Sequence, residues 1–273
     1  MKRSPGTRHK GWDRGCGIVI LVVLALVALA AILIGLSVGE AKRIEQTLNE
    51  RCGEAPDFVP APDGSIPRER VEAFLRVRAR VYEHCPAIQE RLGILVRLDN
   101  LDRPENVPTT VAIRERFGGL KELFSFGPAF LRFMEARNQA LLDEEMGLGE
   151  YMYIYVLANL EQLHELDDSG FADIEQAHIG NRAREELTQI LRNQLDAFES
   201  AEARPADEDL AANLRDQIAG LAAGQQALPW EDGLPSMIAD SLEPYAESLA
   251  QHYCKGIAKI ELMQKNKGLN FKN

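Results

Sequence analysis

The chain has 273 residues, with 31 basic and 42 acidic side chains and a formal net charge of −11 at pH 7. Only five of the basic residues and one of the acidic residues precede position 40, so the remainder carries a net charge of −15. This balance argues against a nucleic-acid-binding protein, which needs a basic surface, and against broad adhesion to anionic lipid.

Residues 17–38 form a run of 22 residues without a charge. As an α-helix rising ~1.5 Å per residue, the run is ~33 Å long, which is enough to cross the ~30 Å hydrocarbon core of a bilayer. A cleavable signal peptide has a shorter apolar core of ~7–15 residues and ends in an A-x-A-like site, which Ser37-Val38-Gly39 matches poorly. The run therefore predicts a single transmembrane signal-anchor helix.

The charges beside this run predict its orientation. The basic residues that precede it are Lys2, Arg3, Arg8, Lys10 and Arg14, whereas acids and bases balance between positions 39 and 51. Because an excess of Lys and Arg marks the cytoplasmic side, we expect residues 1–16 in the cytoplasm and the chain beyond Val38 exported. The chain lacks N-x-S/T acceptors, which fits a bacterial inner (cell) membrane with a periplasmic or extracellular domain.

Small residues recur every four positions at the end of the run, at Ala31, Gly35 and Gly39. They lie on one helix face, where small side chains let two helices approach closely in lipid. The spacing makes these residues a candidate face for a homodimer of the span. Such spacings also arise by chance in spans rich in Ala and Gly.

Residues 39–66 predict a short continuation of the span helix followed by a spacer. The spacer is indicated by Pro56, Pro60, Pro62 and Pro67, because four prolines within 12 positions exclude a helix. We therefore expect an extended, semi-rigid segment that holds the domain tens of ångströms from the bilayer.

The rest of the chain has the apolar spacing of helices and no run that alternates with the period of a strand. Pro244 lies inside the last expected helix, where it kinks that helix or ends a first short one. The pattern predicts an all-α, irregular multi-helix bundle over 67–265 and a flexible tail over 266–273. The expected helices cover 67–85, 87–99, 110–124, 128–146, 150–166, 171–200, 207–222 and 236–265.

Two arginines stand within apolar stripes, Arg78 in the first of these helices and Arg137 in the fourth. A buried guanidinium must be paired, and Glu144 and Glu145 are the nearest candidate partners of Arg137. We expect a structural ion pair between packed helices, and the alternative is a pocket for an anion or carboxylate.

Three cysteines follow the anchor, and in an oxidising compartment two of them would pair. Cys85 falls on an apolar helix face, whereas Cys254 falls off the apolar stripe of its helix. The spacer can reach across one helix length, so Cys52–Cys85 is the candidate disulfide. The alternative is three reduced or buried thiols.

Five of the ten phenylalanines lie within positions 117–133, a segment interrupted by two glycine-containing turns. Aromatic residues at helical spacing usually belong to the core. The alternative is an apolar surface that accepts a lipid chain or a partner helix. The residues of this candidate surface are Phe117, Phe124, Phe126, Phe130 and Phe133.

Motifs for catalysis and metal binding are weak. The best metal candidates are Glu161…His164 and Glu175…His178, but both motifs lie off the apolar faces of their helices, which indicates solvated surface. The chain has no G-x-S-x-G elbow and no phosphate-binding loop. We expect no catalytic residue, metal or cofactor, although a dispersed active site would not be visible in one sequence.

Together these features predict a membrane-anchored, non-enzymatic protein of the bacterial envelope. Its exported helical domain is expected to bind another protein. The alternative function is binding of a lipid or other apolar small molecule through the Phe117–Phe133 region.

Overall fold

The computed structural model describes residues 39–90, 127–163, 181–201 and 208–262, and every structural statement below concerns these residues. Their regular elements are all helical, which confirms the all-α bundle. None of these helices is both long and apolar enough to cross a bilayer. The candidate anchor 17–38, with Ala31 and Gly35 of the candidate dimer face, lies outside the described residues.

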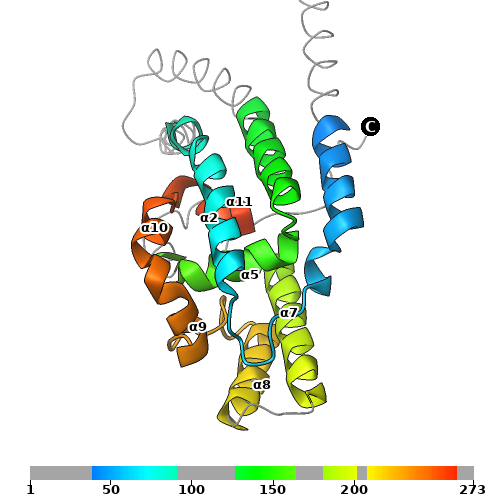
Figure 1. Cartoon of the computed structure of the whole chain (residues 1–273), viewed down its shortest axis with the longest axis vertical. Helices are drawn as coiled ribbons and strands as arrows, with labels where there is room; N and C mark the ends of the chain where they lie inside the picture. Colours follow the sequence, from blue (N-terminus) through cyan, green and yellow to red (C-terminus); the bar gives the residue numbers. More distant parts are fainter. Residues whose placement is uncertain (1–38, 91–126, 164–180, 202–207, 263–273) are drawn as a thin grey trace, which may run out of the picture.

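The bundle is built from short and medium helices (Figure 1). Helices over 39–52, 85–90, 127–143 and 160–163 accompany the labelled elements. The labelled elements are the 3₁₀ turn η1 (Ala55–Asp57), α2 (Arg68–Tyr82), α5 (Leu148–Ala158), α7 (Asn181–Ser200), α8 (Glu208–Ala223), α9 (Ser236–Leu242), the 3₁₀ turn η3 (Glu243–Tyr245), α10 (Ala246–Gln251) and α11 (Lys255–Leu262).

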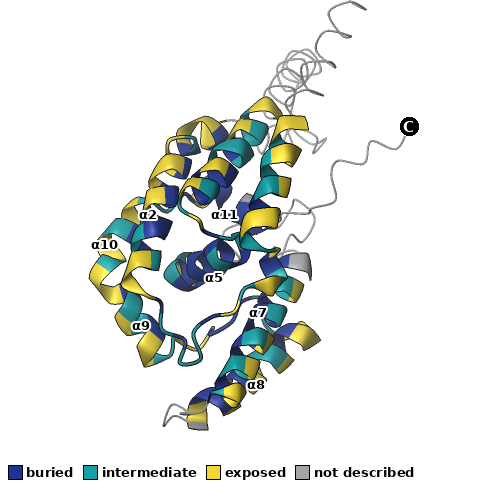
Figure 2. Cartoon of the chain, turned by 45° about the vertical axis from the view of Figure 1, so that its right-hand side comes forward, coloured by how far each residue is buried: buried dark blue, intermediate teal, exposed yellow. Residues whose placement is uncertain are grey.

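Helix α5 is the centre of the fold. The seven residues 151–157 are all buried, because this helix is apolar around its whole circumference and must be covered on every side. The turn η1 and helices α2 and α7 pack against it, and the helices of the bundle turn their exposed faces outward (Figure 2). Asn159 ends α5, so the helix expected over 150–166 is divided at that residue.

The helix expected over 236–265 is also divided. Pro244 ends a first short helix, as predicted, since α9 stops at Leu242 and η3 follows. A second break at residues 252–254 separates α10 from α11 and was not predicted. This break turns Cys254, which is 1% exposed, into the core.

Residues 53–67, called the strap below, lie against the bundle and do not extend from it. Ala55 and Pro60 are buried, and Asn193 Nδ2 on α7 donates hydrogen bonds to the carbonyl oxygens of Pro56 (2.8 Å) and Phe58 (2.9 Å). The expected spacer is therefore wrong. Prolines exclude an α-helix here but leave carbonyl groups that α7 binds.

A close backbone contact fastens the strap to α5. A Cβ atom added to Gly149 would overlap the carbonyl oxygen of Ala55. Only glycine permits this approach. The ring of Phe58 packs beside that of Tyr153, with centroids 5.8 Å apart.

The helix over 39–52 also belongs to the domain. Leu48 is fully buried in the core, and Cys52 packs against it. Gly39, the third residue of the candidate dimer face, is exposed with open space around it. The sequence predicted that the folded domain starts at residue 67. The structure shows that it starts earlier, because the helix over 39–52 is part of it.

Candidate functional site

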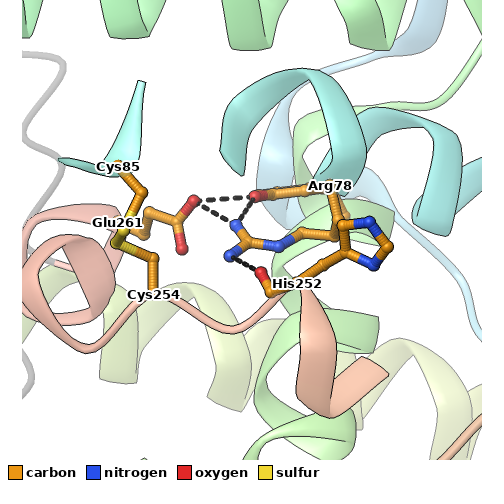
Figure 3. Close-up of a disulfide and its surroundings, with 6 residues drawn as sticks. Arg78, Cys85, His252, Cys254 and Glu261 are labelled. Carbon is orange, nitrogen blue, oxygen red and sulfur yellow. Dashed lines mark hydrogen bonds and ion pairs between the residues drawn. A yellow bond between two sulfur atoms is a disulfide. The ribbon is translucent and has the colours of Figure 1, made fainter. Parts of the chain in front are cut away.

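The most elaborate polar arrangement in the described core is centred on Arg78 (Figure 3). Its Nη1 donates to Glu261 Oε1 at 2.5 Å and to the Tyr151 hydroxyl at 2.8 Å, and its Nη2 donates to the carbonyl oxygen of His252 at 2.8 Å. Tyr151 in turn donates to Glu261 Oε1 at 2.8 Å. The side chains of Arg78 and Glu261 are 2% and 1% exposed, so this is a buried ion pair.

Three helices bring these groups together. Arg78 lies on the buried face of α2 among Val71, Phe74, Val77 and Val81, Tyr151 comes from α5 and Glu261 from α11. The guanidinium also stands over the Tyr155 ring, 4.9 Å from its centroid. Burial acts to lower the pKa of Arg78, but Glu261, Tyr151 and Tyr155 together outweigh burial and hold that pKa above its ordinary value.

Arg137 is buried beside this network but lacks the partners expected for it. Its Nε and Nη2 donate to Asn138 Oδ1 at 3.0 and 2.6 Å. Glu144 instead pairs with Arg76 at 2.7 Å, and the carbonyl of Glu145 accepts from Arg70, so the expected pairing is wrong. Burial lowers the pKa of Arg137. Periodicity identified both buried arginines, but it carried no sign of Glu261, which is 183 residues from Arg78.

A cavity of about 20 Å³ adjoins the network. Arg137, Tyr155 and Glu261 line it, together with apolar side chains of α5. Two buried oxygens, Glu261 Oε2 and the Tyr155 hydroxyl, have no hydrogen-bond partner in the described part of the chain. The volume suits roughly one water molecule, so the arrangement joins helices and leaves no room for an organic anion.

A disulfide lies next to Glu261 (Figure 3) and joins Cys85 to Cys254, with Cα atoms 6.1 Å apart. The expected Cys52–Cys85 pairing is therefore wrong, and Cys52 is a half-buried free thiol. The error has a physical cause. An unbroken helix would turn Cys254 away from the core, whereas the break before α11 turns it inward.

The candidate phenylalanine surface is only partly described, because Phe117, Phe124 and Phe126 lie outside the described residues. Phe133 is fully buried and belongs to the core, so for this residue the surface reading is wrong. Phe130 is half-buried and stacks on Phe133, with centroids 6.4 Å apart. These two rings pack inward.

A larger hollow is lined by the C-terminal end of α5 together with α9 and α10. In Figure 1 this end of α5 points toward these two helices. We call the hollow the acidic groove; its volume is about 540 Å³. Its floor consists of four buried leucines, and its rim carries four carboxylates. The floor is Leu157, Leu160, Leu242 and Leu249, and the rim is Glu161, Glu231, Asp232 and Glu243.

The rim loop between α8 and α9 is held in a defined conformation. Glu231 Oε1 accepts hydrogen bonds from the backbone N–H groups of Ala227 (2.8 Å) and Leu228 (3.0 Å). Trp230 is buried, and its backbone N–H donates to Gln217 Oε1 at 2.7 Å. Two of the four rim carboxylates, Glu231 and Asp232, therefore belong to a loop that its own hydrogen bonds hold in place. Sequence reasoning missed this groove, because two distant stretches of the chain, 157–162 and 231–250, form it.

Metal binding has no support in the described residues, where no cluster of three His, Cys, Asp or Glu side chains has a suitable arrangement. His164, Glu175 and His178 of the Glu-x-x-His motifs lie outside those residues, whereas Glu161 belongs to the groove rim. The chain matches no known family model, no curated protein and no solved structure.

Proposed function

We propose that this chain is a non-enzymatic, single-span protein of the bacterial cell membrane whose exported helical domain binds a partner protein. The observation that carries the proposal is the acidic groove, a preformed hollow with an apolar floor and a polar rim. Fully buried apolar centres with polar rims are typical of surfaces that recognise proteins.

The location rests on two independent features. The run 17–38 is long enough to span a bilayer, and basic residues precede it. The buried Cys85–Cys254 disulfide fits an oxidising compartment outside the cytoplasm. Both features support an exported domain.

Binding of a lipid through the Phe117–Phe133 region is the second candidate, and it has less support. Phe133 is occupied in the core, and Phe130 stacks upon it. The groove could accept apolar groups, but its four carboxylates would repel the head groups of anionic lipids.

Reporter fusions test the location. Alkaline phosphatase, which is active only when exported, is fused after Asn273 of the full chain and, separately, ahead of Met1 of the full chain. We expect activity only from the first fusion. An inactive first fusion with an active second one would overturn the proposed orientation.

Photocrosslinking in cells tests the partner. A photoreactive residue replaces Ala246 or Ala250, which are exposed groove positions, and in the control it replaces Ala212, which is exposed on α8. We expect an adduct with one other protein from the groove positions and none from the control. If the groove positions give only adducts between copies of this chain, the proposed function fails.

A further inference from the structure

We infer that the acidic groove binds a cationic amphipathic helix, a partner segment with leucine-like side chains along one face and lysines or arginines beside them. The inference rests on the proposed function and names the chemistry of its partner. Three observations lead to it: the unpaired charge of the rim, the apolar floor and the small side chains of the walls.

The four rim carboxylates gather at one groove that has no basic side chain among its described residues. Six exposed or half-buried acids pair with arginines, as Glu144 does with Arg76 and Glu199 with Arg215. None of the four rim carboxylates forms an ion pair in the described part of the chain, and no Lys, Arg or His is among the described groove residues. Backbone N–H groups partly compensate Glu231, but no cation faces the rim in the described chain, so the rim keeps a net negative charge that attracts a cation-bearing partner.

The floor selects among cationic partners. Leu157, Leu160, Leu242 and Leu249 present apolar side chains at the base of a hollow of about 540 Å³. A polyamine or a bare lysine chain would leave this volume to water. A partner that has apolar side chains between its cationic ones can do both: its apolar side chains fill the hollow, and its cationic side chains reach the rim carboxylates.

The walls are lined by small side chains, which favour a helix as the partner. Ala158, Ala239, Ala246 and Ala250 border the groove on α5, α9 and α10. Alanines let the backbone of a docked helix approach closely, and the apolar residues at three- and four-residue spacing on such a helix then enter the groove. An extended peptide has no free strand edge to pair with among the described elements.

Two designed peptides test this chemistry on the full chain, purified in a non-ionic detergent. Both have 14 residues, with leucines at helical spacing and one central photoreactive residue; lysine fills the polar positions of the first and glutamate those of the second. We expect the lysine peptide to label α9, α10 or residues 160–163, as mapped by mass spectrometry, and the glutamate peptide to leave them unlabelled. Labelling should fall when the salt concentration is raised to 0.5 M.

Variants then assign the effect to the rim. Glu161→Gln combined with Glu243→Gln should weaken binding of the lysine peptide roughly fivefold, because each exposed charge pair contributes modestly. The matched control is Glu185→Gln with Asp196→Asn, which removes the same charge from exposed positions on α7 and should leave affinity unchanged. Both variant pairs alter exposed side chains, so we expect neither pair to change the stability of the fold.

Equal labelling by both peptides, or equal affinity of the rim and control variants, would overturn the inference. The adduct from Ala246 or Ala250 in cells would then still support a partner of other chemistry. Conversely, selective labelling by the lysine peptide without any such adduct would support the chemistry of the groove and count against the proposed function.

Discussion

At the scale of single residues, Arg78 is held on all sides. A carboxylate, a hydroxyl group, a backbone carbonyl and an aromatic ring face surround its guanidinium. Charge in such a site is tolerated only because the opposite charge of Glu261 is buried with it. Removal of that one carboxylate leaves a buried cation without compensation.

Replacement of Glu261 by Gln tests this dependence. We expect the free energy of unfolding to fall by about 3–5 kcal/mol, because Arg78 stays buried and charged without its partner. Urea titration of the full chain, followed by circular dichroism, measures the change. Glu247→Gln on the exposed side of α10 is the control and should change stability by less than ~0.5 kcal/mol. A loss below 1 kcal/mol in the Glu261 variant would contradict this account.

The buried tyrosines make stability sensitive to alkali. Burial raises the pKa values of Tyr151, Tyr153 and Tyr155 above the ordinary value of a tyrosine side chain. The folded chain therefore retains protons that the unfolded chain releases, so stability is fully present below pH ~10 and falls as the pH rises beyond it.

Absorbance at 295 nm measures this titration. At pH 11 we expect a smaller tyrosinate signal from the native chain than from the chain in guanidinium, and the missing signal should return on unfolding. Tyr153→Phe should lower the signal in guanidinium and leave the native signal at pH 11 unchanged. A matching decrease in both would show that Tyr153 titrates in the folded protein.

At the scale of elements, α2 and the strap organise the bundle. Arginines on α2 reach acids near the junction of the 127–143 helix and α5, as in the pairs Arg70–Glu150 at 2.5 Å and Arg76–Glu144 at 2.7 Å. The strap fills the other side of α5, through the contact between Ala55 and Gly149. Segments that come before α5 in the chain thus cover two of its sides, and α7 and α11, which follow it, cover others.

Gly149→Ala tests the close contact between the strap and α5. The added Cβ would overlap the carbonyl oxygen of Ala55, so the strap must shift, and we expect a loss of about 2 kcal/mol or more in the free energy of unfolding. Faster proteolytic cleavage between residues 53 and 67 should accompany the loss. Gly127→Ala, where nothing lies within 4 Å of the new Cβ, should not destabilise the chain. Equal effects of the two substitutions would contradict the close contact.

Elements were predictable where a local pattern decides them. The apolar period of α2, α7 and α8 predicted helices close to their observed positions, and Pro244 predicted the end of α9. The strap was not predictable, because proline excludes an α-helix without saying whether the segment packs on the domain. That outcome depends on Asn193, more than 130 residues away.

At the scale of the whole molecule, one covalent bond and one ion pair close the fold across its length. The disulfide joins residues separated by 169 positions, and the partners of the ion pair are 183 positions apart. Periodicity tells which face of a helix is buried, so it located Arg78 and Cys85. It does not tell which helices meet, so it found neither Glu261 nor Cys254 as their partners, nor the acidic groove.

Replacement of Cys85 and Cys254 by Ser should lower the stability of the whole domain. Closing so long a loop restricts the unfolded chain, and its loss corresponds to roughly 2–5 kcal/mol and a fall of roughly 10 °C in Tm. Reducing agent should have the same effect on the unaltered chain, as measured by thermal unfolding. Cys52→Ser should leave Tm near its original value. A Tm that does not respond to reductant would count against the pairing.

The positions of the disulfide and the ion pair along the chain have a mechanical consequence. Arg78 precedes Cys85 by seven residues, and Glu261 follows Cys254 by seven, so the ion pair lies outside the covalent loop. A tension applied between Arg78 and Glu261 would separate the ion pair first and then stop at the disulfide. The 169-residue separation within the loop would stay slack, withholding roughly 600 Å of extended chain from any stretch. Such a pull would pass through the disulfide and not along residues 86–253, which include α5.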